Sequence, residues 1–319
     1  MAPPFITAVI CTRNRARQLD LALRSLLRQT VPRAQYEILV VDNGSTDDTP
    51  AVCAAQASAG VRCVAEPVAG LSRARNTGWR EARGDVVGYL DDDGQAAPGW
   101  LAGVLETFRD VRPAPAWAGG PIDLDWRVPP PAWLDAPMQE CLGALDLGNE
   151  PRWLAPHERL GGGNSFFPRA LLAELNGFDE RLGRVNNLLL SGEETQLQRR
   201  IEARQGRLYY HPAIRMLHDV PPERVRPAFF YRRYYWGGIT DTVIRRTLRE
   251  HLPGAGAALP TAMSRGGTRT RDTLRRALPR IVAAAGVATR DNRIRGRIYL
   301  AYVLGICRGR LLRLPAGHP

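Results

Sequence analysis

Three consecutive aspartates directly follow the apolar run VVGYL at residues 86–90. Carboxylates this close together repel one another, so burying them is costly unless a cation neutralises their charge. Mg²⁺ and Mn²⁺ suit such oxygen ligands, and Mg²⁺ commonly binds through one or two carboxylates and the phosphates of a substrate. Asp91, Asp92 and Asp93 therefore predict a divalent-cation site for a phosphate-bearing ligand, with a solvated acidic loop as the alternative.

Polar residues also follow the first two apolar runs of the chain. The first run ends in CTRNR, which includes Thr12 and Arg13, and the second ends in DNGSTD, which begins with Asp42 and Asn43. A carboxylate at such a strand end could accept a hydrogen bond from a base or a ribose. The alternative for DNGSTD is a turn followed by a helix N-cap.

A third polar segment, GLSRARNTG, contains Arg73, Arg75 and Asn76. Guanidinium groups donate to phosphate in a bidentate fork, so this segment is a candidate anion site. The alternative is the exposed start of a helix.

Glu193 and Glu194 stand at the start of a helical pattern, directly after Ser191 and Gly192. The helix dipole keeps a carboxylate at a helix N-terminus ionised, which suits a general base. The alternative is a capping box, in which Glu194 only bonds the backbone N–H of Ser191. His218, at the end of a predicted strand, is either structural or a ligand to a cation that few carboxylates hold.

The elements that must position these residues alternate between strand and helix patterns. Short apolar runs predict strands at residues 5–10, 37–41, 61–64 and 86–90. Helical patterns between them cover residues 19–27 and 72–82. This alternation predicts an α/β fold with a mostly parallel sheet flanked by helices, in which ligands bind beyond the carboxyl ends of the strands.

The pattern changes in the second half of the chain. Residues 121–160 are rich in Pro and Trp and have no clear period, which predicts a long excursion over the surface. Regular patterns then predict a strand at 164–168, a short helix, and a longer helix at 192–206. Past Val220 the chain predicts Arg-rich helical segments with a weak break at 253–262.

The charge is unevenly distributed along the 319 residues. The formal net charge is +12, and all 44 basic residues are arginine. Residues 1–220 hold 24 arginines and 27 acids, a net of −3, whereas residues 221–319 hold 20 arginines and 5 acids, a net of +15. The overall composition is that of a globular protein, which excludes disordered, collagenous and repeat proteins.

The basic C-terminal third mixes apolar residues with arginines, as in IRGRIYLAYVLGICRGRLLRL. Such segments can lie in a membrane interface, where arginine is drawn to anionic headgroups. The alternative is a helical cap over the α/β domain. We expect no nucleic-acid partner, because the segment contains no recognised binding motif.

Cysteine usage and the N-terminus indicate the compartment. The five cysteines are scattered, without a Cys-x-x-Cys pair, so we predict core thiols rather than a disulfide framework or a zinc site. The N-terminus has no basic segment, and its apolar stretch is too short for a signal peptide. No run approaches the ~18 apolar residues of a transmembrane helix. We expect a cytoplasmic protein, with peripheral attachment to the inner membrane face as an option.

In combination, these motifs resemble glycosyltransferase family 2, whose members have the GT-A fold and bind nucleotide-diphospho-sugars. The resemblance covers roughly residues 5–218 and includes CTRNR, EILVVDNGSTD, GLSRARNTGW and YLDDDG, which is the DXD motif of the family. It continues through GGGNSFFPRALLAELNGFDERL, the Glu-Glu helix and the final histidine. Each motif is weak by itself, but their shared order makes the resemblance specific.

The resemblance implies roles for individual residues. The donor nucleotide would be bound by Thr12, Arg13, Asp42, Asn43, Arg75, Asn76, Asp91 and Asp92. Mn²⁺ or Mg²⁺ would be held by Asp93, Asp91 and His218. The family usually has Glu-Asp where this chain has Glu193 and Glu194, so Glu194 falls at the position of the catalytic base. GFDE, at residues 177–180, resembles the turn on the acceptor side.

The resemblance also implies an inverting sugar transfer to an acceptor hydroxyl, with a glycan or a lipid-linked molecule as acceptor. Residues 1–220 would form the GT-A catalytic domain, with the nucleotide-sugar half at about 1–120 and the acceptor half at about 121–220. Residues 184–191 are the candidate lid, and residues 221–319 a basic helical extension. Two other classes stay open, a catalytically silent sugar-nucleotide-binding protein and a basic membrane-surface adaptor.

Overall fold

The computed structural model describes residues 5–156, 158–252 and 290–312, which form two compact units. Unit 1 comprises Met1–Asp125, Gly143–Phe178 and Ile201–Asp219. Unit 2 comprises Trp126–Leu142, Asp179–Arg200 and Val220–Pro319. The predicted break at 253–262 and the Arg-rich segment at 273–289 lie outside the described residues. The division into a catalytic domain and a basic extension concerns function and stays a prediction.

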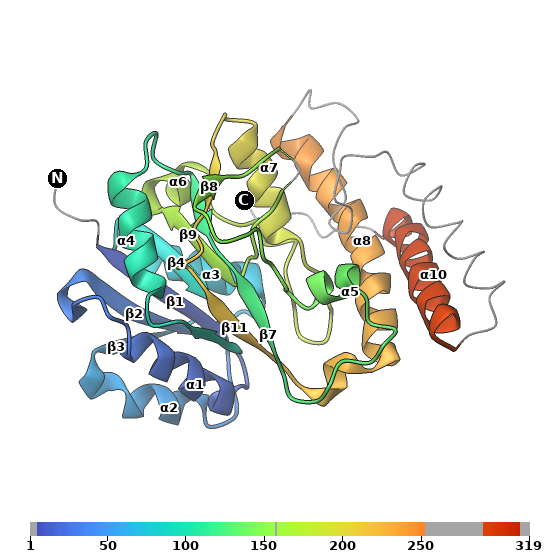
Figure 1. Cartoon of the computed structure of the whole chain (residues 1–319), viewed down its shortest axis with the longest axis horizontal. Coiled ribbons are helices and arrows are strands. Elements are labelled where there is room, and N and C mark those ends of the chain that lie inside the picture. The colour runs from blue at the N-terminus through green and yellow to red at the C-terminus, as the bar shows by residue number, and fades with distance from the viewer. Residues whose placement is uncertain (1–4, 157, 253–289, 313–319) are drawn as a thin grey trace. The chain divides into compact units, whose positions relative to one another are not determined.

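Unit 1 is built on a mixed sheet of eight strands in the order β3-β2-β1-β4-β9-β6-β10-β8 (Figure 1). The strands are β1 Ile6–Thr12, β2 Tyr36–Asp42, β3 Val61–Ala65, β4 Val86–Leu90, β6 Trp117–Gly119, β8 Arg152–Trp153, β9 Asn164–Pro168 and β10 Leu208–Tyr210. Strands β1 to β4 are parallel, whereas β9 runs antiparallel to both β4 and β6. The expected α/β fold with a mostly parallel sheet is therefore confirmed, and so are its first four strands.

Helices cover both faces of this sheet. The helices of unit 1 are α1 Ala16–Leu27, α2 Thr49–Ala55, α3 Leu71–Glu81, α4 Trp100–Asp110 and α6 Arg169–Glu174, and its 3-10 helices are Arg33–Gln35 and Ala57–Ala59. Alternate residues of β1, such as Ile6 and Ile10, form one core with Leu23 of α1 and Trp100 of α4. On the opposite face, α3 packs against β1 and β2. Burial on both faces explains why these strands read as continuous apolar runs.

A smaller sheet supports the edge at which β4 ends. Its strands are β5 Gly94–Ala96, β7 Ile122–Trp126 and β11 Met216–Val220, in the order β5-β11-β7. β5 and β11 are antiparallel, and the register sets His218 opposite Gly94. His218 is therefore the central residue of its strand, not the last, because β11 continues to Val220.

Unit 2 is mainly helical. Its elements are α5 Ala136–Cys141, the first part of α7 Glu193–Glu202, the 3-10 helix Pro222–Val225, α8 Pro227–His251 and α10 Arg290–Leu311. α8 and α10 lie side by side (Figure 1), which confirms the expected helical C-terminal extension. Within the described ranges, no helix carries an apolar stretch long enough to span a bilayer.

Two sequence predictions are wrong in detail. Residues 121–160 are not only a surface excursion, because they contain β7, α5 and β8 and bury Trp133 and Met138. The short elements do not produce a period that a window of residues can detect. The cysteines are free, as expected, but Cys63 and Cys307 are exposed and do not belong to a core.

Candidate functional site

The three aspartates form a tight turn between β4 and β5 in unit 1. The backbone N–H of Asp91 donates to the carbonyl of Gly163 at 3.2 Å, and that of Gly94 donates to the carbonyl of Asp91 at 2.9 Å. A Cβ atom on Gly163 would overlap the carboxylate of Asp91. Because Gly163 has no side chain, the carboxylate of Asp91 fits beside it at this edge of the sheet.

One arginine serves two of the three carboxylates. Nη1 of Arg15 lies 2.7 Å from Oδ2 of Asp93 and 3.3 Å from Oδ1 of Asp92. The hydroxyl of Thr12 donates to Oδ2 of Asp92 at 2.9 Å, which places Thr12 beside the aspartate turn, and its contact with a nucleotide stays a prediction. Sequence reasoning selected Arg13, whose side chain is exposed, and missed Arg15. The positive φ of 53° at Asn14 forms the turn that brings Arg15 back to the aspartates.

The electrostatics of this turn show a shortage of positive charge. Burial and the nearby Asp93 carboxylate raise the pKa of Asp92 to about 7, although Arg15 opposes the change. Burial lowers the pKa of Arg15, but Asp92 and Asp93 outweigh it and raise that pKa above its usual value. The guanidinium of Arg15 thus faces both carboxylates in a partly buried site, and a further cation would relieve their repulsion.

His218 reaches the same turn from a distant part of the chain. Its Nε2 atom lies 3.3 Å from Oδ1 of Asp93, and both side chains are largely buried. The backbone N–H of Asp219 donates to the carbonyl of Asp93 at 3.0 Å. The pairing of β11 with β5 therefore brings a predicted metal ligand beside the aspartates.

Arg75 supports the first aspartate. Its guanidinium is buried, with Nη2 3.4 Å from Oδ1 of Asp91. The guanidinium carbon lies 5.5 Å from the ring centroid of Phe178, and the hydroxyl of Tyr89 donates to the carbonyl of Arg75 at 2.8 Å. Burial raises the pKa of Cys11 to about 12, although Arg75 opposes the change. Cys11 is thus neutral beside this charged pair.

Other predicted nucleotide contacts have structural partners. Oδ1 of Asp42 accepts from the N–H of Ser45 at 2.9 Å, which shapes the turn after β2. The amide of Asn43 donates to two carbonyls of the loop after β3 and accepts from the N–H of Gly70 at 2.8 Å. The amide of Asn76 bonds both backbone polar groups of Phe178, at 2.9 and 2.8 Å. These three residues hold the loops to which they are bonded, and their contact with a nucleotide stays a prediction.

The donor groups are compatible with a divalent cation. Asp91 and Asp93 offer carboxylate oxygens, and His218 offers an imidazole nitrogen beside Asp93, which is a donor set that suits Mn²⁺. Within the described residues, no group of three or more His, Cys, Asp and Glu is arranged to hold a metal by itself. A cation bound through one or two carboxylates and the phosphates of its substrate needs no such protein cage.

The two glutamates open α7 in unit 2. Glu193 is buried, and Glu194 is half-buried. The capping box is not formed, because the N–H of Ser191 donates to the hydroxyl of Thr240 at 3.2 Å. Within the part of the chain that the structure describes, Oε2 of Glu194 is buried and has no hydrogen-bond partner. Because the carboxylate of Glu194 does not cap the helix, it is available for a proton transfer.

A third carboxylate, Asp179 of the GFDE segment, is fully engaged within unit 2. Arg181 binds it through two nitrogens at 2.9 and 2.7 Å, and Nε2 of His251 lies 3.1 Å away. Burial raises the pKa of Asp179, but the hydrogen bonds from Arg181 and His251 outweigh it and hold that pKa below its usual value. Asp179 therefore anchors the GFDE turn to the end of α8.

The comparisons with known proteins agree with this geometry. Residues 7–127 match the family model described as Glycosyl transferase family 2. The glucosyl-dolichyl phosphate glucuronosyltransferase of Haloferax volcanii is 24% identical over 253 residues, which is 75% of this chain and 77% of that protein. The pre-mycofactocin glycosyltransferase of Mycobacterium tuberculosis is 27% identical over 244 residues. That match covers 75% of this chain and 48% of the relative, so the chain spans about half of its length.

A solved structure extends the likeness to the whole fold. The mannosyltransferase PcManGT from Pyrobaculum calidifontis, in complex with GDP-Man and Mn²⁺, superposes with a TM-score of 0.61 at 21% identity. The match covers 97% of this chain and 88% of that one. This likeness shows that the chain has the GT-A fold, and the part of the chain at residues 7–127 matches glycosyltransferase family 2. The protein is thus a glycosyltransferase.

Proposed function

We propose that this glycosyltransferase moves a sugar from a nucleotide-diphospho-sugar to an acceptor hydroxyl with inversion at the anomeric carbon, in polysaccharide or glycolipid synthesis. The observation that carries the proposal is the carboxylate turn after β4, where Asp92 and Asp93 share one guanidinium. Such a site gains from a cation that arrives with an anionic diphosphate. The GDP-Man and Mn²⁺ in the PcManGT complex support this choice of ligand.

Each predicted donor residue has a role in this proposal. Thr12, Arg13, Asp42 and Asn43 would lie near the base and the ribose, and Arg75 and Asn76 would line the same pocket. Asp91 would lie nearer the ribose or the bridging oxygens, with Asp92 beside it. Asp93, Asp91 and His218 are the residues that would hold Mn²⁺ or Mg²⁺. When bound, the cation supplies positive charge that stabilises the departing diphosphate. Arg15 and Arg75 add fixed positive charge at the same edge of the sheet.

Glu194 is the proposed general base, with Glu193 as its neighbour at the start of α7. The carboxylate of Glu194 takes the proton from the acceptor hydroxyl while the hydroxyl oxygen forms a bond to the anomeric carbon. The bond from that carbon to the diphosphate oxygen breaks, and the nucleoside diphosphate leaves with the electron pair. Its buried oxygen without a hydrogen-bond partner among the described residues supports Glu194 for this role.

The segment 184–191 is the proposed lid of unit 2. Arg233 of α8 donates to the carbonyl of Leu189 at 3.4 Å and to the hydroxyl of Ser191 at 2.9 Å. Hydrogen bonds of this kind can break and re-form, as a segment that must open for the acceptor requires. A lid that excludes water would protect the reacting sugar from hydrolysis.

The acceptor is proposed to be a glycan or a lipid-linked molecule at an anionic membrane surface. The Haloferax relative is named for glucosyl-dolichyl phosphate, which supports a lipid-linked acceptor. Leu300, Leu304 and Leu311 of α10 are exposed by 46%, 53% and 77%, and their spacing places them along one helix face. Exposed arginines at 293, 297 and 308 accompany this apolar stripe. An amphipathic face of this kind can rest in an anionic bilayer interface.

The donor proposal is tested by the unfolding temperature in the presence of UDP, GDP or TDP, with and without Mn²⁺ or Mg²⁺. We expect at least one nucleotide to raise it only when the metal is present, and Asp93→Asn to abolish that increase. Asp110→Asn, an exposed carboxylate that pairs with Arg109, is the matched control and should behave as the wild type. An increase that persists in EDTA with Asp93→Asn would contradict the metal assignment.

The membrane proposal is tested by sedimentation with phosphatidylglycerol vesicles. We expect salt-sensitive binding that Leu304→Gln weakens roughly tenfold, because a leucine no longer enters the interface. Val68→Gln changes a valine of unit 1 that is exposed by 51% and should leave the binding unchanged. Equal effects of the two substitutions, or no binding at low salt, would overturn the proposal.

A further inference from the structure

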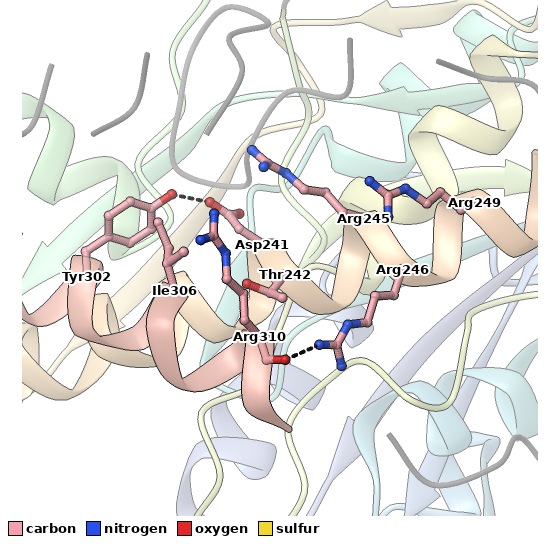
Figure 2. Close-up of a pocket in the computed structure, with 8 residues that line it drawn as sticks. All are labelled: Asp241, Thr242, Arg245, Arg246, Arg249, Tyr302, Ile306 and Arg310. Atoms are coloured by element: carbon pink, nitrogen blue, oxygen red, sulfur yellow. Dashed lines mark hydrogen bonds between the residues drawn. The ribbon is translucent and has the colours of Figure 1, made fainter. Parts of the chain in front are cut away.

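Unit 2 contains a basic cavity between α8 and α10 (Figure 2). Its volume is about 300 Å³, at the lower end of the range of small-molecule sites. Arg245 and Arg249 come from successive turns of α8, and Arg310 comes from α10 (Figure 2). The cavity belongs to a part of the chain that the proposed sugar transfer does not use.

Close helix packing gives the cavity a fixed frame. A Cβ atom on Gly305 of α10 would overlap the carbonyl oxygen of Tyr235, and one on Gly238 of α8 would overlap that of Tyr302. A Cβ atom on Gly309 would come within 2.9 Å of Thr242. Backbones this close cannot slide past one another without strain. The arginines therefore project from a rigid helix pair.

One of the four arginines in the cavity has a structural role. Arg246 donates to the carbonyl oxygens of Arg310 and Leu312, at the C-terminal end of α10. This arrangement satisfies carbonyls that a helix end leaves without partners. Three guanidinium groups remain, those of Arg245, Arg249 and Arg310.

Among the residues that the structure describes, none of these three groups forms an ion pair with a carboxylate. Within the described ranges, no carboxylate lies within ion-pair distance of any of them, and the buried Nε atom of Arg245 makes no hydrogen bond. The carboxylate in the cavity, that of Asp241, accepts a hydrogen bond from the hydroxyl of Tyr302. Like-charged side chains that line one cavity favour an anion between them.

We propose that the cavity between α8 and α10 binds a phosphate or diphosphate group, at a site separate from the donor site of unit 1. Guanidinium groups match phosphate oxygens in a bidentate fork, which favours phosphate over a small spherical anion. Thr242 adds a hydroxyl, and Ile306 forms an apolar wall for whatever carries the phosphate. The phosphate belongs either to a lipid headgroup or to a soluble molecule.

Calorimetric titration of the full chain with inorganic pyrophosphate tests the site. EDTA is present so that metal-dependent binding at the aspartates does not contribute. We expect the double variant Arg249→Gln/Arg310→Gln to lower the affinity roughly tenfold or more, because two charge-assisted contacts are lost. Both side chains are exposed and make no described hydrogen bond, so the fold should persist. Arg246 still finds the backbone carbonyl of residue 310.

Arg28→Gln/Arg83→Gln is the matched control, since it removes two exposed arginines of unit 1 that do not line the cavity. Unchanged affinity in the control, with loss in the cavity variant, supports the site. Equal affinities in all three proteins, or equal losses in both variants, would overturn it. In the second arm, a parallel loss of phosphatidylglycerol vesicle binding in the cavity variant assigns the phosphate to a lipid headgroup. Unchanged vesicle binding assigns it to a soluble molecule.

Discussion

Two buried aspartates, one in each unit, have pKa values that are shifted in opposite directions. The side chain of Asp92 in unit 1 is 13% exposed, and its pKa rises to about 7 because of burial and the neighbouring carboxylates. The side chain of Asp179 in unit 2 is 5% exposed, yet its pKa lies below the usual value. Asp92 shares the guanidinium of Arg15 with Asp93, whereas Asp179 pairs with both Arg181 and His251.

The difference separates carboxylates that the fold satisfies from those that it leaves for a ligand. A buried acid with enough cationic partners contributes to stability, whereas one without them costs stability until a ligand supplies the charge. Perturbed carboxylates of the second kind collect at functional sites. We therefore expect substitutions of satisfied carboxylates to affect folding, and substitutions of unsatisfied ones to affect activity.

The largest effect on activity is expected at Glu194, whose carboxylate does not form the helix cap. Glu194→Gln keeps the shape of the side chain and removes the proton acceptor, so sugar transfer should fall by ~10² or more. Nucleotide binding and the unfolding temperature should stay at their wild-type values. Turnover of the donor with a supplied acceptor measures the effect. Glu150→Gln, an exposed glutamate, is the control. Full activity of the Glu194 variant would move the base elsewhere.

Asp179 should show the opposite behaviour. Asp179→Asn breaks a buried ion pair and should lower the free energy of unfolding by about 3 kcal/mol at pH 7. The folded-state pKa lies below the unfolded value of about 4. The contribution is therefore complete above pH 4 and disappears as the pH falls further. Urea unfolding at pH 6 and pH 3 measures the difference, and a gap that does not shrink at low pH would contradict the satisfied pair.

The smallest effect is expected at Asp92. Its pKa is higher in the folded state, so ionisation opposes folding at pH 8, and protonation removes this penalty progressively as the pH falls from about 7 to the unfolded value of about 4. Without metal, Asp92→Asn should raise the free energy of unfolding by about 1 kcal/mol at pH 8 and by a clearly smaller amount at pH 5. Urea unfolding in EDTA at both pH values checks the sign. Destabilisation at pH 8 would place Asp92 among the satisfied carboxylates.

Local patterns in the sequence predicted the parallel strands and the aspartate turn, because each depends on neighbouring residues. Apolar runs that end in polar residues identify strands buried on both faces, and Asp91 follows such a run. The spacing of Ser191 and Glu194 is equally local but did not settle the cap, because Thr240 of α8 takes the N–H of Ser191. The spacing of residues within one segment cannot show that a side chain of another helix accepts this hydrogen bond.

The parts of the site that the sequence did not predict depend on backbone conformation and on contacts between residues far apart in the chain. Arg15 reaches the aspartates because Asn14 has a positive φ. Both charged residues of CTRNR are arginines, so the residue type does not show which of them reaches the aspartates. The signal for a further arginine lay in the negative charge of the aspartate turn, since three neighbouring carboxylates require several cations. The amides of Asn43 and Asn76 resemble ligand-binding groups in the sequence, but their backbone partners lie 23 to 102 residues away.

The strand pairing that places His218 beside Asp93 has a consequence for synthesis of the protein. The two residues are 125 positions apart in the chain, so the ribosome delivers His218 well after Asp93. At about 5–20 residues per second, this delay is roughly 6–25 s. During that interval, the acidic turn emerges without the strand that completes its edge. The growing chain must therefore keep three carboxylates and the unpaired edge of β5 in solvent until β11 arrives.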